Sequence, residues 1–265
     1  MHGMEVDYYK KLFQTIGNIL DLIEKDDMPK YLLFLENAFP YMDNYNYHKG
    51  MKEIIQELKV LLKTKSIGTD SDRALLLDFQ AALETQPEKA IKLEKNALAQ
   101  IENITADNAR LVSNLHANLG GLYRMNGYPD LAREHMEKSI SLLDQFNLLH
   151  INDSIPQIAN YAMFLTKQQE PERGISELQK LSGIIKEYHS DECLDYAKVQ
   201  ENLATIYLMT ANLSQAKTHF KKAFKIYEKI LADEPEMIEA KYREIQELYP
   251  QIGFSIGKTL SGLLT

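Results

Sequence analysis

Apolar residues recur every three or four positions along most of this chain, in stretches long enough for several helical turns. This spacing places the apolar side chains on one face of an α-helix. Turn-forming residues separate the stretches, such as Asn126-Gly127 and Gln169-Glu170-Pro171. The pattern therefore predicts an all-α protein, with helices at 71–84, 88–102, 109–126, 130–146, 154–168, 172–188, 194–210 and 214–232.

The stretches also repeat with a period of 42 residues. Segment 118–140 aligns without a gap with segment 202–224, and this offset is two periods. Four columns of equivalent positions follow from the period: Leu77, Leu119, Tyr161 and Leu203; Ala81, Tyr123, Leu165 and Tyr207; Ala90, Ala132, Gly174 and Ala216; Ala97, Ser139, Leu181 and Ala223. Each repeat therefore predicts a hairpin of two antiparallel helices. The third column is small because the second helix crosses the first closely there, and each hairpin needs a neighbour to cover its remaining apolar face.

The repeat resembles the tetratricopeptide repeat. The residues that carry the resemblance are Leu119-Gly120, Tyr123, Gly127 and Ala132 in the second repeat, and their counterparts in the fourth: Leu203-Ala204, Tyr207, Ala216, Phe220 and Ala223. The usual period of that family is about 34 residues. The longer period, with Asn before the Leu, resembles the subclass in kinesin light chains and the sensor domains of bacterial peptide-pheromone regulators. The resemblance covers about residues 70–232 and implies hairpins stacked into a right-handed superhelix.

Three parts of the chain are expected. Residues 1–66 form N-terminal helices, with a cap at 5–25 and one degenerate repeat at about 28–64. Leu35, Phe39 and Ile55 keep the period there, whereas Pro40 and His48 argue against close packing. Residues 67–232 form four repeats. Residues 233–265 form a capping helix at about 236–248, where Ile245 keeps the period, and a tail.

Composition and charge narrow the function classes. The net charge is −8, with 38 acidic and 30 basic residues, which does not favour nucleic-acid binding. One basic stripe has i, i+4 spacing, and it is interpreted as a solvated outer helix face: Lys217, Lys221, Lys225 and Lys229. No apolar run has the length of a membrane span, and the first 30 residues lack the apolar core of a signal peptide. With a single cysteine, Cys193, the expectation is a cytoplasmic protein without disulfides.

Two short motifs could carry chemistry, and both favour a simpler interpretation. Segment 253–259 resembles a phosphate-binding loop, but it has three residues between its glycines where that loop has four. The cluster His189, Asp191, Glu192 and Cys193 follows one helix and precedes the next, as a connecting loop does. Since no catalytic constellation appears, we expect no enzyme activity, no cofactor and no metal.

A polar column is the strongest functional signal. Asn118, Asn160 and Asn202 recur at the repeat period, although Asn is a poor residue for a helix interior. The resemblance places this column at the edge of a concave groove, where asparagines of related proteins hold peptide backbones. Arg124, Lys167 and Lys198 project from the same helices, with Glu201 as the acidic exception. The alternative is that each Asn bonds to the neighbouring repeat.

These observations predict a non-catalytic module that binds a protein or peptide segment in extended form. The asparagines hold its main chain, the basic residues favour an acidic segment, and apolar pockets supply the remaining affinity. The pocket residues are Met163, Leu208 and Met209. Two alternatives stay open: a structural or oligomerisation scaffold, and the sensor part of a larger peptide-responsive regulator. Membrane and nucleic-acid partners are not expected, and homo-oligomerisation is left open.

Overall fold

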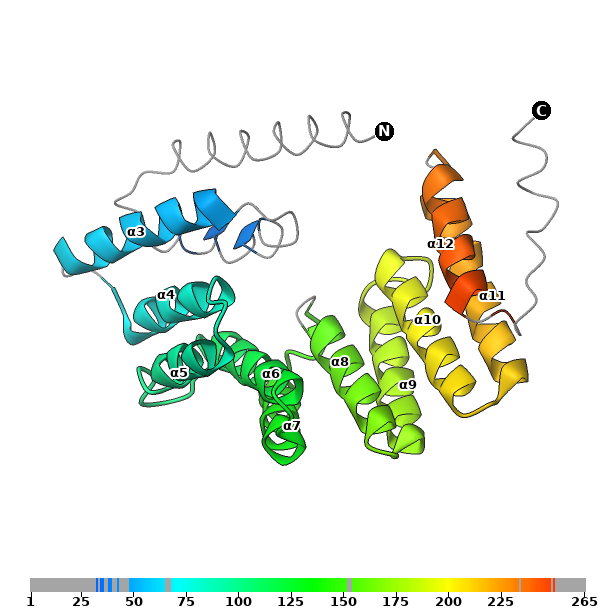
Figure 1. Cartoon of the computed structure of the whole chain (residues 1–265), viewed down its shortest axis with the longest axis horizontal. Helices are drawn as coiled ribbons and strands as arrows, with labels where there is room; N and C mark the ends of the chain where they lie inside the picture. Colours follow the sequence, from blue (N-terminus) through cyan, green and yellow to red (C-terminus); the bar gives the residue numbers. More distant parts are fainter. Residues whose placement is uncertain are drawn as a thin grey trace. The chain divides into compact units, whose positions relative to one another are not determined.

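The computed structural model describes residues 32, 34, 35, 38, 39, 42, 48–64, 68–151, 154–233, 235–248 and 250. These residues form helices, turns and loops but no strand, which confirms the all-α fold class (Figure 1). The helices are α3 (His48–Thr64), α4 (Asp70–Ala82), α5 (Pro87–Leu98), α6 (Ala109–Met125), α7 (Pro129–Gln145), α8 (Ser154–Lys167), α9 (Pro171–Tyr188), α10 (Leu194–Met209), α11 (Leu213–Ile230) and α12 (Pro235–Leu248). Most bounds lie within two residues of those expected from the sequence. The exception is α5, which ends at Leu98, not at 102.

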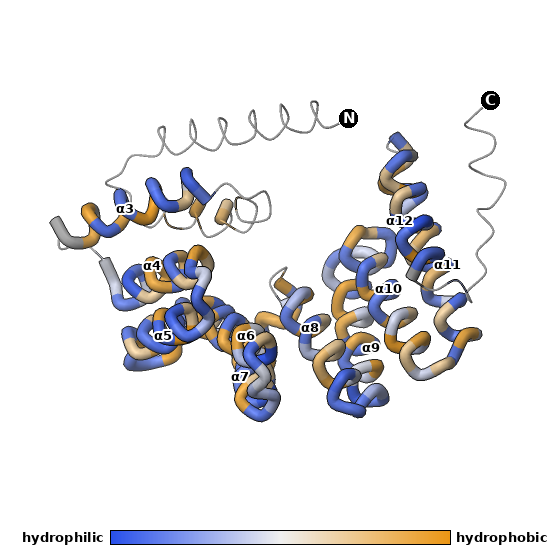
Figure 2. Tube along the Cα trace, viewed as in Figure 1, coloured by the Kyte–Doolittle hydropathy of each residue, from blue (hydrophilic) through white to orange (hydrophobic). Residues whose placement is uncertain are grey.

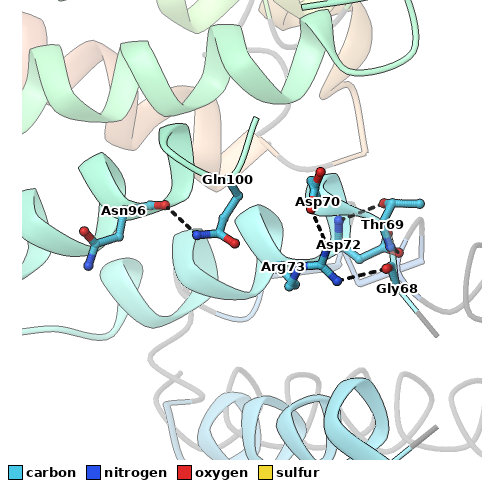
Figure 3. Close-up of polar contacts among 7 residues, drawn as sticks. All are labelled: Gly68, Thr69, Asp70, Asp72, Arg73, Asn96 and Gln100. Carbon is cyan, nitrogen blue, oxygen red and sulfur yellow. Dashed lines mark hydrogen bonds and ion pairs between the residues drawn. The ribbon is translucent and has the colours of Figure 1, made fainter. Parts of the chain in front are cut away.

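The helices begin where the sequence supplies suitable first-turn residues. Proline occupies the first turn of α5 and of α9, where its missing N–H costs nothing. At α4 the side chain of Thr69 accepts a hydrogen bond from the backbone N–H of Asp72, whose carboxylate accepts from Thr69 N–H in return (Figure 3). Arg73 donates to the carbonyl of Gly68, 3.0 Å away, and closes this turn (Figure 3). Local sequence thus determines the starts of these helices.

The chain divides into two compact units, Met1–Leu142 and Leu143–Thr265, called here the first and the second unit. The boundary falls near the end of α7. In Figure 2 apolar and polar segments alternate along each helix, as expected for helices with one buried face. None of the helices in the described part of the chain has the length and apolarity of a membrane span.

In the first unit, the small-residue column lies where helices cross. Ala90 and Ala132 are buried, and Gly120 faces α7 so closely that a Cβ on it would lie 3.3 Å from the Ala132 carbonyl oxygen. The N-terminal part packs on α4 through a stacked pair of rings, Phe39 and Phe79, whose centroids are 4.0 Å apart. Leu35 and Ile55 are buried in the same cluster. The expected cap at 5–25 lies outside the described residues.

In the second unit, α8 pairs with α9 and α10 pairs with α11 as antiparallel hairpins (Figure 1). A Cβ on Gly174 would lie 2.6 Å from the carbonyl oxygen of Ala162, so the backbones of α9 and α8 nearly touch. Helix α12 packs on α11, where the rings of Tyr242 and Phe224 stack with centroids 3.8 Å apart. The helix expected near 236–248 is therefore present and covers the last hairpin. The tail at 253–265 lies outside the described residues.

Candidate functional site

The three asparagines of the polar column lie on the first helices of their hairpins. Asn118 is on α6 of the first unit, whereas Asn160 on α8 and Asn202 on α10 belong to the second. Helices α8 and α10 contact each other directly. Asn160 is exposed and Asn202 is half-buried, and neither side chain has a hydrogen-bond partner among the described residues. The second unit thus presents two amides, on helices in contact, that have no hydrogen-bond partner in the described part of the chain.

Asn118 differs from the other two. Its Nδ2 donates to Asp78 Oδ1 on α4 at 2.8 Å, so this amide is bonded to the preceding first helix. Such a contact is what the internal-bonding alternative expects. Sequence alone did not distinguish Asn118 from Asn160 and Asn202, because the three share one column.

The charges around the column come mostly from exposed basic residues. Arg124, Lys167 and Lys198 are all exposed, and Lys198 lies 3.8 Å from the carboxylate of Asp195. Glu201 is already neutralised: Lys241 Nζ lies 2.8 Å from its Oε1, and the Tyr227 hydroxyl donates to its Oε2 at 2.8 Å. Burial lowers the pKa of Lys241, but the hydrogen bonds and charges of Glu201 and Glu244 together outweigh burial and raise the pKa. The acidic exception therefore contributes little free negative charge to this face.

The apolar residues expected to line pockets divide between surface and core. Met209 is 49% exposed and Met163 is half-buried, so both can contact a partner. Leu208 is only 8% exposed and packs in the cluster between α10, α11 and α12. The expectation for Leu208 is corrected on this point. The signal was in the sequence, since Ala204 and Leu208 are four residues apart and share one helix face.

The polar residues of the loop at 189–193 each contact a different part of the chain and do not gather at one site. Asp191 pairs with Lys186 at 3.1 Å, Glu192 pairs with Lys229, and His189 Nε2 contacts the carbonyl oxygen of His150 at 2.8 Å. Cys193 Sγ accepts from the backbone N–H of Tyr196 at 3.4 Å and caps α10. Among the described residues, no three or more side chains gather in a way that could hold a metal ion.

A recurring buried polar pair was missed from the sequence. In the second repeat the Nδ1 atoms of His116 and His135 lie 2.8 Å apart. In the fourth repeat, two periods later, His219 Nδ1 lies 2.8 Å from Gln200 Oε1. Burial, followed by the charge of His135, lowers the pKa of His116 to about 4. These pairs lie between the two helices of a hairpin, so they stabilise the hairpin and do not face a partner. The sequence did contain a signal for these pairs, because His135 and His219 are two repeat periods apart.

Comparison with known proteins agrees with this architecture. Residues 154–229 match the family model described as tetratricopeptide repeat. No curated protein matches the chain. The structure of BtubC (BKLC) from P. vanneervenii is similar at 19% identity, with a TM-score of 0.57, over 69% of this chain and 72% of that one.

A second similar structure is a putative kinesin light chain with nearly identical TPR-like repeats from Podosopora anserina. It has 15% identity and a TM-score of 0.57, over 74% of this chain and 96% of that one. At such identities the likeness establishes the fold alone. Repeats of this type are in general non-catalytic and bind other proteins. Together with the family match at residues 154–229, these findings show that the chain has the helical-hairpin solenoid fold of tetratricopeptide repeats.

Proposed function

We propose that this protein binds an extended segment of another protein, held by Asn160 and Asn202 on the first helices of two adjacent hairpins. The observation that carries the proposal is that both amides lie outside the core without a partner among the described residues. An Asn amide can donate to a peptide carbonyl and accept from a peptide N–H at the same time. Two such groups on neighbouring helices can therefore hold a main chain without reading its sequence.

The spacing of helices supports this mode of binding. Packed helices lie roughly 8–10 Å apart, and an extended chain rises about 3.3 Å per residue. One Asn per first helix therefore meets about every third residue of a bound strand. In the first unit Asn118 has the equivalent position, but its Nδ2 is engaged by Asp78. The proposal therefore rests on Asn160 and Asn202 of the second unit.

The charges favour an acidic segment. Lys167 and Lys198 are exposed on α8 and α10, the helices that carry Asn160 and Asn202. Glu201 lies among these positions but is neutralised by Lys241. Exposed basic residues contribute more to the association rate than to affinity, and their effect falls as salt increases.

The size of the amide contribution shows that apolar residues must supply part of the binding energy. Each amide contact contributes about 0.5–1.5 kcal/mol net, so two together fall well short of the roughly 8 kcal/mol of micromolar binding. Met163 and Met209 are accessible apolar residues on α8 and α10, the helices that carry Asn160 and Asn202, and methionine adapts to differently shaped partners. We propose that contacts with them supply affinity and side-chain preference.

The test uses a library of displayed peptides selected against the full chain, followed by calorimetry on one selected peptide. The double variant Asn160→Ala/Asn202→Ala should weaken binding by about 5- to 150-fold, as expected for two lost amide contacts. Its melting temperature should stay within a degree or two of the parent, because neither amide bonds within the described protein. Unchanged affinity in a stable double variant would contradict the proposal.

A matched control is Asn96→Ala, an exposed Asn on the second helix α5. This variant should bind the selected peptide as the parent does. Replacing Lys167 and Lys198 by Met should reduce affinity mainly at low salt, since screening removes their contribution at high salt.

A scaffold role is the second candidate, and one observation favours it. Asn118 bonds to Asp78 of the neighbouring repeat, as an internal contact of a purely structural column would. A scaffold predicts that Asn160→Ala/Asn202→Ala loses stability or changes the oligomeric state. Light scattering on the parent and the double variant distinguishes this outcome from lost peptide affinity.

A further inference from the structure

The first repeat has two acidic residues at positions where the other repeats are apolar. Asp78 occupies the position of Gly120, Ala162 and Ala204, and Glu94 occupies that of Met136, Leu178 and Phe220. These two positions touch across a hairpin: in the second repeat a Cβ on Gly120 would lie 2.6 Å from Met136 Cγ. In the first repeat the corresponding side chains are both carboxyls.

The buried carboxyl of Glu94 lies against the half-buried carboxyl of Asp78. Glu94 is 2% exposed, and its side chain forms a hydrogen bond with Asp78. Its Oε2 has no hydrogen-bond partner among the described residues. Asp78 also accepts from Asn118 Nδ2 at 2.8 Å. The contact therefore joins α4, α5 and α6 at one point.

A hydrogen bond between two carboxyl groups needs a proton, because ionised carboxylates only accept. Two adjacent negative charges out of water would also repel strongly. Burial, and then the charge of Asp78, raise the pKa of Glu94 to about 10, and burial also raises the pKa of Asp78. Geometry and electrostatics thus agree that the pair retains a proton at neutral pH.

We propose that Asp78 and Glu94 share a single proton that joins the first hairpin to α6 through Asn118, and that losing it loosens this repeat. One carboxyl donates to the other, and the remaining charge is stabilised by the amide of Asn118. When the shared proton leaves for solvent, two like charges remain in contact, one of them on the buried side chain of Glu94. The proposal concerns the first unit and does not depend on the proposed binding function.

No cation among the described residues compensates the charge of this pair. Helix α4 contributes Asp78, α5 contributes Glu94, and α6 contributes the neutral amide of Asn118. Lys95, next to Glu94 on α5, lies over the Tyr123 ring, 5.7 Å from its centroid. Helix α3 also packs on α4, and among its described residues no charged group shifts the pKa of either carboxyl.

The sign of the pH dependence follows from linkage. A carboxyl whose pKa is raised in the folded state binds a proton that the unfolded chain releases. The stabilisation of the fold by this proton is complete below pH 4.5, the pKa of Glu94 in the unfolded chain. It is lost as the pH rises toward about 10, the pKa of Glu94 in the folded protein. Between these values the unfolding equilibrium constant rises about tenfold per pH unit because of this one proton.

Urea unfolding of the full chain between pH 7 and 9, followed by circular dichroism, tests the proposal. Glu94→Met copies the second repeat, and Glu94→Gln keeps the shape of the side chain without a charge. For each pH unit, the unfolding equilibrium constant of the parent should rise about tenfold more than that of either variant. Glu88→Gln, an exposed position on α5, is the matched control and should behave as the parent. Equal slopes for the parent and the Glu94 variants would overturn the proposal.

Infrared spectroscopy of the parent gives a second readout that needs no variant. A protonated carboxyl band should be present near pH 7.5 and should disappear at strongly alkaline pH. Its absence at neutral pH overturns the proposal even if neither variant folds. Added Ca²⁺ should leave the parent's melting temperature unchanged; an increase that Glu94→Gln abolishes would mean that a cation neutralises the pair.

Discussion

Lys241 Nζ lies 2.8 Å from Glu201 Oε1, and this ion pair joins α12 to α10. The Tyr227 hydroxyl on α11 donates to the other oxygen of Glu201, so one carboxylate connects three helices. The contact therefore helps to hold α12 against the hairpin formed by α10 and α11. Glu201 precedes Asn202 on α10.

Replacing Lys241 by Met should loosen α12. The substitution keeps the apolar stem and removes the charge, which leaves Glu201 with Tyr227 alone. The pair is partly shielded, with Lys241 33% and Glu201 20% exposed, so a loss of about 1 kcal/mol is expected. Thermal melting measures it, and added salt should reduce the difference. Lys217→Met, at an exposed lysine of α11, is the control and should melt as the parent.

Two glycines of the same helix should respond oppositely to alanine. Gly174→Ala adds a Cβ 2.6 Å from the Ala162 carbonyl oxygen, so α8 and α9 must separate. We expect a loss of about 1–3 kcal/mol. Gly183 has no atom within 4 Å of such a Cβ, and Gly183→Ala should stabilise α9 by up to about 1 kcal/mol. Urea unfolding of both variants provides the measurement. Changes of the same sign would show that the crossing is not at Gly174.

The other small positions at helix crossings should reject larger side chains. Ala132 and Ala216 are fully buried, so leucine at either position overpacks the contact between the two helices of a hairpin. Each substitution should cost about 1–3 kcal/mol of unfolding free energy. Melting within a degree of the parent for both variants would contradict the packing described here. Ala240→Leu, exposed on α12, serves as the comparison and should have a small effect.

Acid should destabilise the second repeat through His116. Its pKa is about 4 in the folded protein, below its ordinary value of 6.5, because burial disfavours the charged ring. Between pH 6.5 and 4, His116 is therefore protonated in the unfolded chain but neutral in the folded protein. This stabilisation is complete above pH 6.5 and is lost as pH falls toward 4, by up to about 3 kcal/mol. His116→Phe should flatten the melting curve against pH between 7 and 4.5, and an unchanged acid limb would contradict this assignment.

The sequence by itself determined the helices and their crossings. Helix bounds follow from local features, such as apolar spacing and proline in the first turn, so a linear reading finds them. The small column at Ala90, Ala132, Gly174 and Ala216 was also readable, because the 42-residue period superimposes equivalent contacts. The same period located the polar column at Asn118, Asn160 and Asn202. It could not say which members bond within the protein.

Only the tertiary structure decided those partnerships. Asn118 reaches Asp78, 40 residues earlier in the chain, because α4 and α6 are neighbours in space. Asn160 and Asn202 have no acidic residue at the position equivalent to Asp78, where Gly120 and Ala162 stand instead. The neutralisation of Glu201 by Lys241 and the burial of Leu208 beside exposed Met209 were settled in the same way. Periodicity specifies which positions face a neighbour, whereas charge pairing and burial depend on which side chains the neighbour presents at that point.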